Sequence, residues 1–326
     1  MRFDMSKIRR VRALVITIVI SAAPVGAIPD RRVQAPATAA ATTSFRVQVT
    51  GRGRPMILIP GLMSSGETWT STVARYQDRF QCHVLTLAGF AGVPPISQPL
   101  LATVRTELAA YIRNQRLERP VIVGHSLGGT LALALAAEHP DLAGPLVIVD
   151  SLPFLAGAQM QAKTVEDARA GAAAMRTYMA TQTPQQFQGY IKAGTATEFM
   201  VKSPADHERI KTWGLGSDQR TAADAMADLM LMDVRQDIAK ITSPTFVLGT
   251  WIGLHEQLKK YGMALSRADV VGTFEQQFVA LPKLHFAITD TARHFIMFDD
   301  PQWFFAELDA FLTNPELVVR TRGFEK

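Results

Sequence analysis

The sequence predicts an α/β fold in which a mostly parallel sheet carries helices on both faces. Short apolar runs rich in β-branched residues alternate along the chain with segments of helical spacing. Most of these runs are apolar throughout, which is typical of strands buried on both faces of a parallel sheet. The two patterns together predict a layered α/β core.

The first run, Phe45–Thr50, alternates apolar and polar residues and so predicts a strand at an exposed edge. The buried runs that follow are Met56–Gly61, His83–Gly89, Pro120–Ser126, Gly144–Ser151, Ser243–Trp251 and Lys283–Thr289. Helical spacing is found in Leu100–Gln115, Leu127–Glu138, His255–Val279 and Asp300–Leu312.

The alternation is interrupted by residues 152–240, which contain no strand pattern and are rich in Ala, Met and Gln. Two stretches within this segment, Glu166–Gln182 and Arg220–Ile238, have the spacing of amphipathic helices. We therefore expect a helical insert between two strands of the core.

The N-terminus is typical of a secretion signal. A basic start precedes the apolar run Ala13–Ala23, which is too short to span a bilayer, and Val25 and Ala27 suit a cleavage site. Residues 1–27 are expected to be a signal peptide and residues 28–44 a flexible tether rich in Ala, Thr and Pro. The alternative is an uncleaved membrane anchor. With the signal removed, we expect an exported, periplasmic bacterial protein without stable membrane insertion.

Charge and cysteine content exclude two classes of protein. The first 27 residues hold five basic side chains and one acidic one, so they carry nearly all of the net charge of +5. The nearly neutral remainder does not resemble a phosphate-binding surface, so no nucleic-acid partner is expected. Cys82 is the single cysteine, which rules out an internal disulfide.

One serine stands between two glycines where a predicted strand meets a predicted helix. Gly124, Ser126 and Gly128 form a G-x-S-x-G pattern at this turn. Such a turn holds the serine in a strained conformation and raises its hydroxyl above the sheet, while the glycines let strand and helix approach closely. The following helix directs its positive dipole end at the same point, which suits a developing oxyanion.

With these patterns in place, the chain resembles the α/β-hydrolase superfamily. The resemblance rests on LIPGLMSSGETW (residues 58–69), GHSLGG (124–129), VIVDS (147–151) and TARHFIMFDDP (291–301), in the family's order. It implies a mostly parallel eight-stranded sheet with a helical cap inserted after strand six. The core is then residues 45–151 and 241–326, and the cap is residues 152–240.

The resemblance also implies a catalytic triad in the order serine, acid, histidine. Ser126 is the expected nucleophile, and His294, in the loop after the last strand, is the expected base. The acid is ambiguous, because the usual position after the strand Ser243–Trp251 falls on Gly253. Asp150, at the end of the preceding strand, is our first choice. Glu256 is the runner-up acid, and Asp290, four residues before His294, is a third candidate.

The neighbourhood of the serine supplies the remaining site residues. The backbone N–H of Leu127, directly after the serine, is expected to form one half of the oxyanion hole, and the family resemblance implies that the N–H of Leu62 forms the other. Gly61, Met63 and His125 are expected around the substrate pocket, with His125 as a packing residue, and Trp69 lies at the entrance or packs beneath it.

These residues predict a serine hydrolase that cleaves a small-molecule carboxylic ester through an acyl-enzyme on Ser126, without metal or organic cofactor. Methionines and aromatic residues of the insert favour an apolar substrate group, such as a bulky ester or lactone. The alternatives are an amidase, perhydrolase or C–C hydrolase with the same triad, a non-catalytic ligand-binding protein on this scaffold, and a surface-interaction protein.

Overall fold

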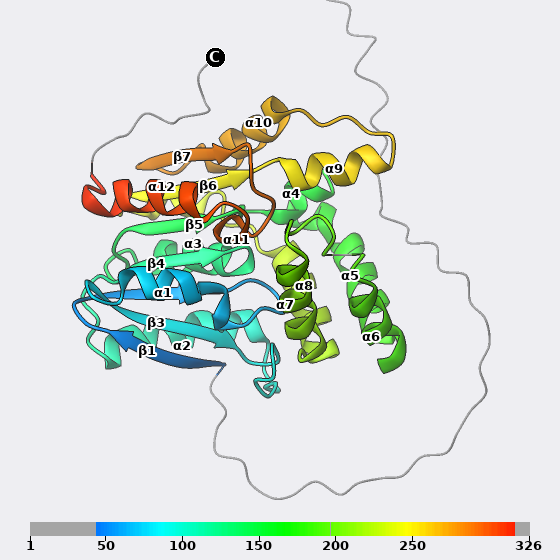
Figure 1. Ribbon diagram of the computed structural model, residues 1–326, viewed down its shortest axis with the longest axis horizontal. Helices are drawn as coiled ribbons and strands as arrows, with labels where there is room; N and C mark the ends of the chain where they lie inside the picture. The colour runs from blue at the N-terminus through cyan, green and yellow to red at the C-terminus, as the bar shows by residue number, and fades with distance from the viewer. Residues whose placement is uncertain (1–43, 196, 317–326) are drawn as a thin grey trace, which may run out of the picture.

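A seven-stranded sheet forms the centre of the computed structural model, which describes residues 44–195 and 197–316 (Figure 1). The strand order is β1-β3-β2-β4-β5-β6-β7, and every neighbouring pair is parallel except β1 with β3. The strands are β1 (Phe45–Gly51), β2 (Arg54–Ile59), β3 (Phe80–Leu87), β4 (Val121–His125), β5 (Leu146–Val149), β6 (Thr245–Thr250) and β7 (Leu284–Thr289). The predicted fold class is therefore confirmed.

The number of strands differs from the eight that the family resemblance implied. Among the described residues β1 is the first strand, and its antiparallel pairing with β3 already occupies that edge of the sheet. The apolar runs of the sequence account for these seven strands and for no other. The helical insert consequently follows the fifth strand of this sheet rather than the sixth.

Helices cover both faces of the sheet because side chains alternate along each strand. In β2, Ile57 and Ile59 pack toward one core cluster, whereas Met56 and Leu58 pack toward another. The first cluster includes residues of α2 (Leu100–Asn114), α3 (Leu127–Glu138) and α10 (Arg267–Phe278), and the second includes residues of α1 (Thr70–Tyr76) and α12 (Pro301–Thr313). In Figure 1, α1 and α12 lie in front of the sheet.

Helix α3 is the most deeply embedded of these elements. Every residue from Leu127 to Ala137 is buried, so the helix shows no polar face. A helix that is apolar all round belongs in the interior of a protein. The element that begins directly after Ser126 is therefore part of the core.

The insert between β5 and β6 is helical, as expected, and lies beyond the carboxyl ends of the central strands (Figure 1). It contains α4 (Leu155–Gln159), α5 (Val165–Thr181), α6 (Pro184–Ala193), α7 (Pro204–Leu215), α8 (Gln219–Leu231) and the 3-10 helix η3 (Asp237–Lys240). The remaining helices are η2 (Gly66–Trp69), α9 (Ile252–Lys260) and α11 (Ile296–Asp299).

Hydrogen bonds join the insert to the loops that follow β2 and β3. The N–H of Asp218 donates to the carbonyl of Gly89 at 2.7 Å. The indole Nε1 of Trp213 donates to Glu67 Oε2 at 3.1 Å. The insert is thus held against the same edge of the sheet at which parallel α/β folds place their sites.

The expected signal peptide (1–27) and most of the expected tether (28–44) lie outside the described residues. Within the part of the chain that is described, no helix is both long enough and apolar enough to cross a membrane. The one cysteine, Cys82, is buried, and burial raises the pKa of its thiol to about 11.

Candidate active site

Ser126 is the single residue between strand β4, which ends at His125, and helix α3, which begins at Leu127. Its backbone has φ 52° and ψ −123°, a region that residues with a side chain rarely adopt. Strain of this kind persists only where the surroundings hold it, and it is concentrated at functional sites. One interaction that stabilises this conformation is the hydrogen bond from the Ser126 N–H to the carbonyl of Val149, at 2.9 Å.

The flanking glycines make this turn possible. A Cβ atom on Gly124 would lie 2.3 Å from the carbonyl oxygen of Gly128. A Cβ atom on Gly128 would lie 2.3 Å from the carbonyl oxygen of Ile59. Both positions meet backbone, which has no flexible side chain to move aside. Strand β4, helix α3 and strand β2 therefore meet closely only because these two residues lack side chains.

Asp150 and His294 are brought together although they are far apart in the sequence. Asp150 directly follows β5, and its N–H donates to the carbonyl of Leu248 at 2.7 Å. His294 lies in the loop between β7 and α11. Its Nδ1 is 2.6 Å from Asp150 Oδ2, and the two side chains are 26% and 17% exposed. With Nδ1–H donating to the carboxylate, Nε2 of His294 is left free to accept a proton.

The other two acids considered from the sequence have different partners. Glu256 Oε2 accepts a hydrogen bond from Arg293 Nε at 2.9 Å. Asp290 Oδ1 accepts from Trp251 Nε1 at 2.8 Å and from Arg267 Nε at 2.9 Å. Among the described residues, the carboxylate that pairs with His294 is that of Asp150.

His125 lies against the histidine loop rather than in an open pocket. Its ring centroid is 4.5 Å from that of His294 and 4.4 Å from that of Phe295, and its Nε2 is 3.1 Å from the His294 carbonyl oxygen. It is fully buried and offers no exposed surface to a substrate. Burial, with a smaller contribution from His294, holds the pKa of His125 well below its ordinary value. His125 is therefore neutral, with its proton on Nε2.

The turn Gly61–Ser64 approaches Ser126 from β2. A Cβ atom on Gly61 would lie 3.2 Å from Ser126 Cβ. The N–H of Ser64 donates to the Gly61 carbonyl at 3.3 Å. Because the N–H of Leu62 is trans to that carbonyl in the same peptide, it points away from Ser64. Leu127 is the first residue of α3, so its N–H has no acceptor within the helix.

Met63 and Trp69 occupy different environments. Met63 reaches the insert, since its Cε lies 3.6 Å from where a Cβ on Gly214 would be. Trp69 is fully buried and belongs to the core cluster on the α1 and α12 side of the sheet. Met63 thus lies between the sheet and α7, and Trp69 packs in the interior.

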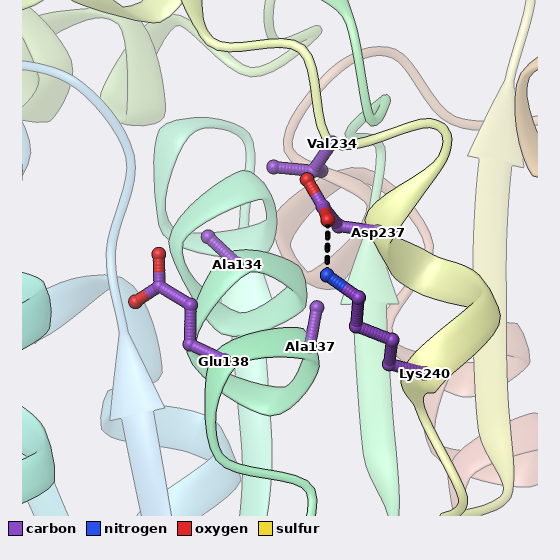
Figure 2. A pocket seen from close by; sticks show the side chains of 6 residues that line it. All are labelled: Ala134, Ala137, Glu138, Val234, Asp237 and Lys240. Carbon is purple, nitrogen blue, oxygen red and sulfur yellow. Dashed lines mark hydrogen bonds and ion pairs between the residues drawn. The ribbon is translucent and has the colours of Figure 1, made fainter.

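A cavity of about 150 Å³ lies at the far end of α3 from Ser126 (Figure 2). It is lined by Ala134, Ala137, Glu138, Val234, Asp237 and Lys240. A helix rises about 1.5 Å per residue, so Ala134 lies roughly 12 Å along the axis from Ser126. The cavity is therefore separate from the serine.

The fold and the residues around Ser126 define an α/β protein whose candidate site lies at the carboxyl ends of the parallel strands. A family model described as the alpha/beta hydrolase family matches residues 56–307. The chain belongs to this family of hydrolases.

Individual relatives are more distant. A pimeloyl-[acyl-carrier protein] methyl ester esterase from Vibrio vulnificus (strain YJ016) is 31% identical over 115 residues, which cover 35% of this chain and 44% of the esterase. An enol-lactonase from Burkholderia xenovorans LB400 has a TM-score of 0.63 at 15% identity, covering 83% of this chain and 96% of the lactonase. The esterase EaEST from Exiguobacterium antarcticum has a TM-score of 0.64 at 13% identity, covering 83% of this chain and 96% of that chain.

The chain spans less than half the length of the Vibrio vulnificus esterase that it matches. At their low identities, the solved structures show the fold alone. The family is thus established, and the activity, the substrate and the roles of individual residues are matters for proposal.

Proposed function

We propose that this protein is a serine hydrolase that cleaves carboxylic esters through an acyl-enzyme on Ser126. The observation that carries the proposal is the 2.6 Å contact between His294 Nδ1 and Asp150 Oδ2. A serine hydroxyl is a weak nucleophile unless a base takes its proton, and a histidine serves best when an acid orients it. The ring of His125, the neighbour of Ser126 in the chain, lies 4.5 Å from that of His294 between centroids, which supports the nearness of base and serine.

In the proposed reaction, Ser126 Oγ attacks the ester carbonyl carbon while His294 Nε2 takes the hydroxyl proton. The tetrahedral intermediate collapses, the carbon–oxygen bond to the alcohol breaks, and His294 returns the proton to the leaving oxygen. Water then attacks the acyl carbon while His294 again takes the proton, and the bond from that carbon to Ser126 Oγ breaks. His294 returns the proton to Oγ as the acid product leaves. The side chain of Asp150 is proposed to stabilise the imidazolium that forms twice in the cycle.

The oxyanion of each intermediate is proposed to rest on the backbone N–H groups of Leu62 and Leu127. The orientation of the Gly61–Ser64 turn and the position of Leu127 at the start of α3 support this assignment. Both donors belong to the backbone, so they are already oriented before the substrate binds. Preorganised donors of this kind are worth roughly 10²–10³ in kcat each.

We propose an apolar ester or lactone as the substrate. Met63 reaches the insert, and Phe154, Ala156, Ala168 and Met230 form an apolar cluster within it. The methyl ester esterase of Vibrio vulnificus, which matches part of this chain, agrees with an ester.

The first test is covalent labelling of the purified protein with a fluorophosphonate, followed by peptide mass spectrometry. We expect an adduct on Ser126 that forms far more slowly in His294→Ala, with Ser126→Ala as the blank. Absence of an adduct in folded wild-type protein would favour a binding protein on this scaffold. Equal labelling of His294→Ala would refute the role of His294.

A second test separates reaction types that share this chemistry. Matched esters, lactones, amides and diketones are offered to the wild type and to Ser126→Ala. We expect turnover of the esters or lactones alone. Faster cleavage of an amide or a diketone would assign the same residues to an amidase or a C–C hydrolase.

A further inference from the structure

Arg293, the residue directly before His294, joins three segments that are distant in the sequence. Its Nη1 donates to the carbonyl oxygens of Glu198 at 3.0 Å and Val201 at 2.7 Å. Its Nε and Nη2 lie 2.9 and 2.8 Å from Glu256 Oε2. One guanidinium group thus ties the histidine loop to the insert and to helix α9.

Backbone contacts reinforce this connection on the other side of His294. The N–H of Phe295 donates to the carbonyl of Met200 at 3.1 Å. Asp299 accepts from the N–H of Lys202 at 2.8 Å through Oδ1, and from the N–H of Arg293 at 2.8 Å through Oδ2. Residues 198–202, which we call the insert strap, are therefore bonded to the loop both before and after the histidine.

Helix α9 contacts the insert strap through both backbone and side chains. A Cβ atom on Gly253 would lie 2.3 Å from the carbonyl oxygen of Phe199, so helix and strap touch through backbone. Lys260 Nζ lies 2.5 Å from Glu198 Oε1 and 4.7 Å from the ring centroid of Phe199. The strap is fixed between α9 and the histidine loop, and Arg293 spans both contacts.

We propose that Arg293 is a positioning residue for His294, which makes the placement of the base depend on the insert. This rests on the proposed role of His294 as base. Asp150 holds the imidazole, but the backbone that carries it is held by the neighbours of His294. The planar fork of arginine reaches the two carbonyls and the carboxylate from three separate nitrogens in a fixed geometry, which the single nitrogen of a lysine cannot reproduce. A base displaced by about 1 Å can lose about 10²-fold in rate.

The kinetic test compares Arg293→Met, Arg293→Lys and the control Arg267→Met, whose arginine binds Asp290 in the same loop. Hydrolysis of p-nitrophenyl acetate and of a longer-chain p-nitrophenyl ester is measured. For Arg293→Met we expect kcat to fall roughly 10- to 100-fold for both esters equally, with little change in KM. The fall in kcat should be smaller in Arg293→Lys than in Arg293→Met, and Arg267→Met should retain full activity.

Other kinetic outcomes would overturn the proposal. A loss confined to the longer ester, or seen only in KM, would mean that Arg293 shapes the substrate pocket. Equal losses of kcat in Arg293→Met and Arg267→Met would mean that the effect is not specific to Arg293 and follows from removing any arginine that contacts this loop.

A readout independent of activity is hydrogen exchange at the amides of Phe295 and Lys202, which cross between loop and strap. We expect faster exchange at both in Arg293→Met and unchanged exchange in Arg267→Met, below the unfolding temperature. Unchanged exchange in Arg293→Met overturns the link itself. If exchange rises but the wild type neither hydrolyses esters nor labels at Ser126, the link stands, and the proposed function and the positioning role fail.

Discussion

Asp150 and His294 are separated by 144 residues in the chain, yet Oδ2 of one lies 2.6 Å from Nδ1 of the other. Asp150 follows the middle of the sheet and His294 follows its last strand, so the contact exists only when β5, β6 and β7 are assembled in register. The pair is thus a product of the whole sheet.

Asp150→Asn should lower kcat by roughly 10³- to 10⁴-fold, because the amide cannot hold the imidazole in the required tautomer or stabilise its cation. Glu256→Gln is the comparison, and it should lose about tenfold at most through its link to Arg293. Both are checked by steady-state ester hydrolysis after circular dichroism shows a folded protein. Near-full activity of Asp150→Asn would transfer the role of acid elsewhere.

His125 should make stability depend on pH. The pKa of His125 is lowered in the folded state by burial, whereas an unfolded histidine takes a proton near pH 6.5. The unfolded chain therefore binds more protons below this pH, so stability is full above it and declines as the pH falls.

The variant His125→Gln keeps a donor toward the His294 carbonyl but cannot titrate. Urea unfolding between pH 4 and pH 8 measures how the free energy of unfolding depends on pH. On the acid side, its slope should be smaller in His125→Gln than in wild type, by up to about 1.4 kcal/mol per pH unit. His139→Gln, at the end of α3, is the control. His83 and His285 also have pKa values lowered by burial, so the comparison between variants is the deciding measurement. An unchanged slope in His125→Gln would contradict the assignment.

Gly128→Ala should destabilise the protein by about 1–3 kcal/mol or prevent folding, because its Cβ would meet the backbone of β2. Gly272→Ala is the matched control, since a Cβ there meets nothing within 4 Å in helix α10. Its stability should rise by about 0.5–1 kcal/mol. Thermal unfolding of both variants checks the pair. Similar shifts of the two midpoints would show that the close approach at Gly128 is tolerated.

Export remains a proposal from the sequence of residues 1–27. Expression of the full chain in a bacterium competent for secretion should yield a periplasmic protein whose first residue is Ile28. Intact-mass and N-terminal peptide mass spectrometry measure this directly. Recovery of the mature protein with residues 1–27 attached would favour the uncleaved anchor.

The sheet could be predicted because its strands are nearly continuous apolar runs, and α3 was predicted over the same bounds that it has in the structure. Helices α6 and α7 were missed, although Thr183-Pro184 and Ser203-Pro204 are start signals for helices. Each helix buries only two or three side chains or glycines, Phe187 and Ile191 in α6 and Ile210, Trp213 and Gly214 in α7, so the apolar pattern of each is short.

Only part of the candidate site could be predicted from the sequence. Ser126 was marked by local spacing, since the turn needs glycine at fixed offsets. The partners of His294 depend on which strand ends are neighbours, and no local pattern encodes that. The contact of His125 with the His294 carbonyl spans 169 residues and had no signal in the sequence.

The complete burial of α3 has a consequence for how the protein would fail when heated. Ser126 is mounted on an element whose amides can exchange only when the core opens, whereas His294 depends on a surface loop held by hydrogen bonds to the insert. On moderate heating, the loop that carries His294 should therefore lose its position before the helix that follows Ser126 unfolds. Inactivation should then precede global unfolding, and it should reverse on cooling when the loop re-forms its hydrogen bonds to the insert.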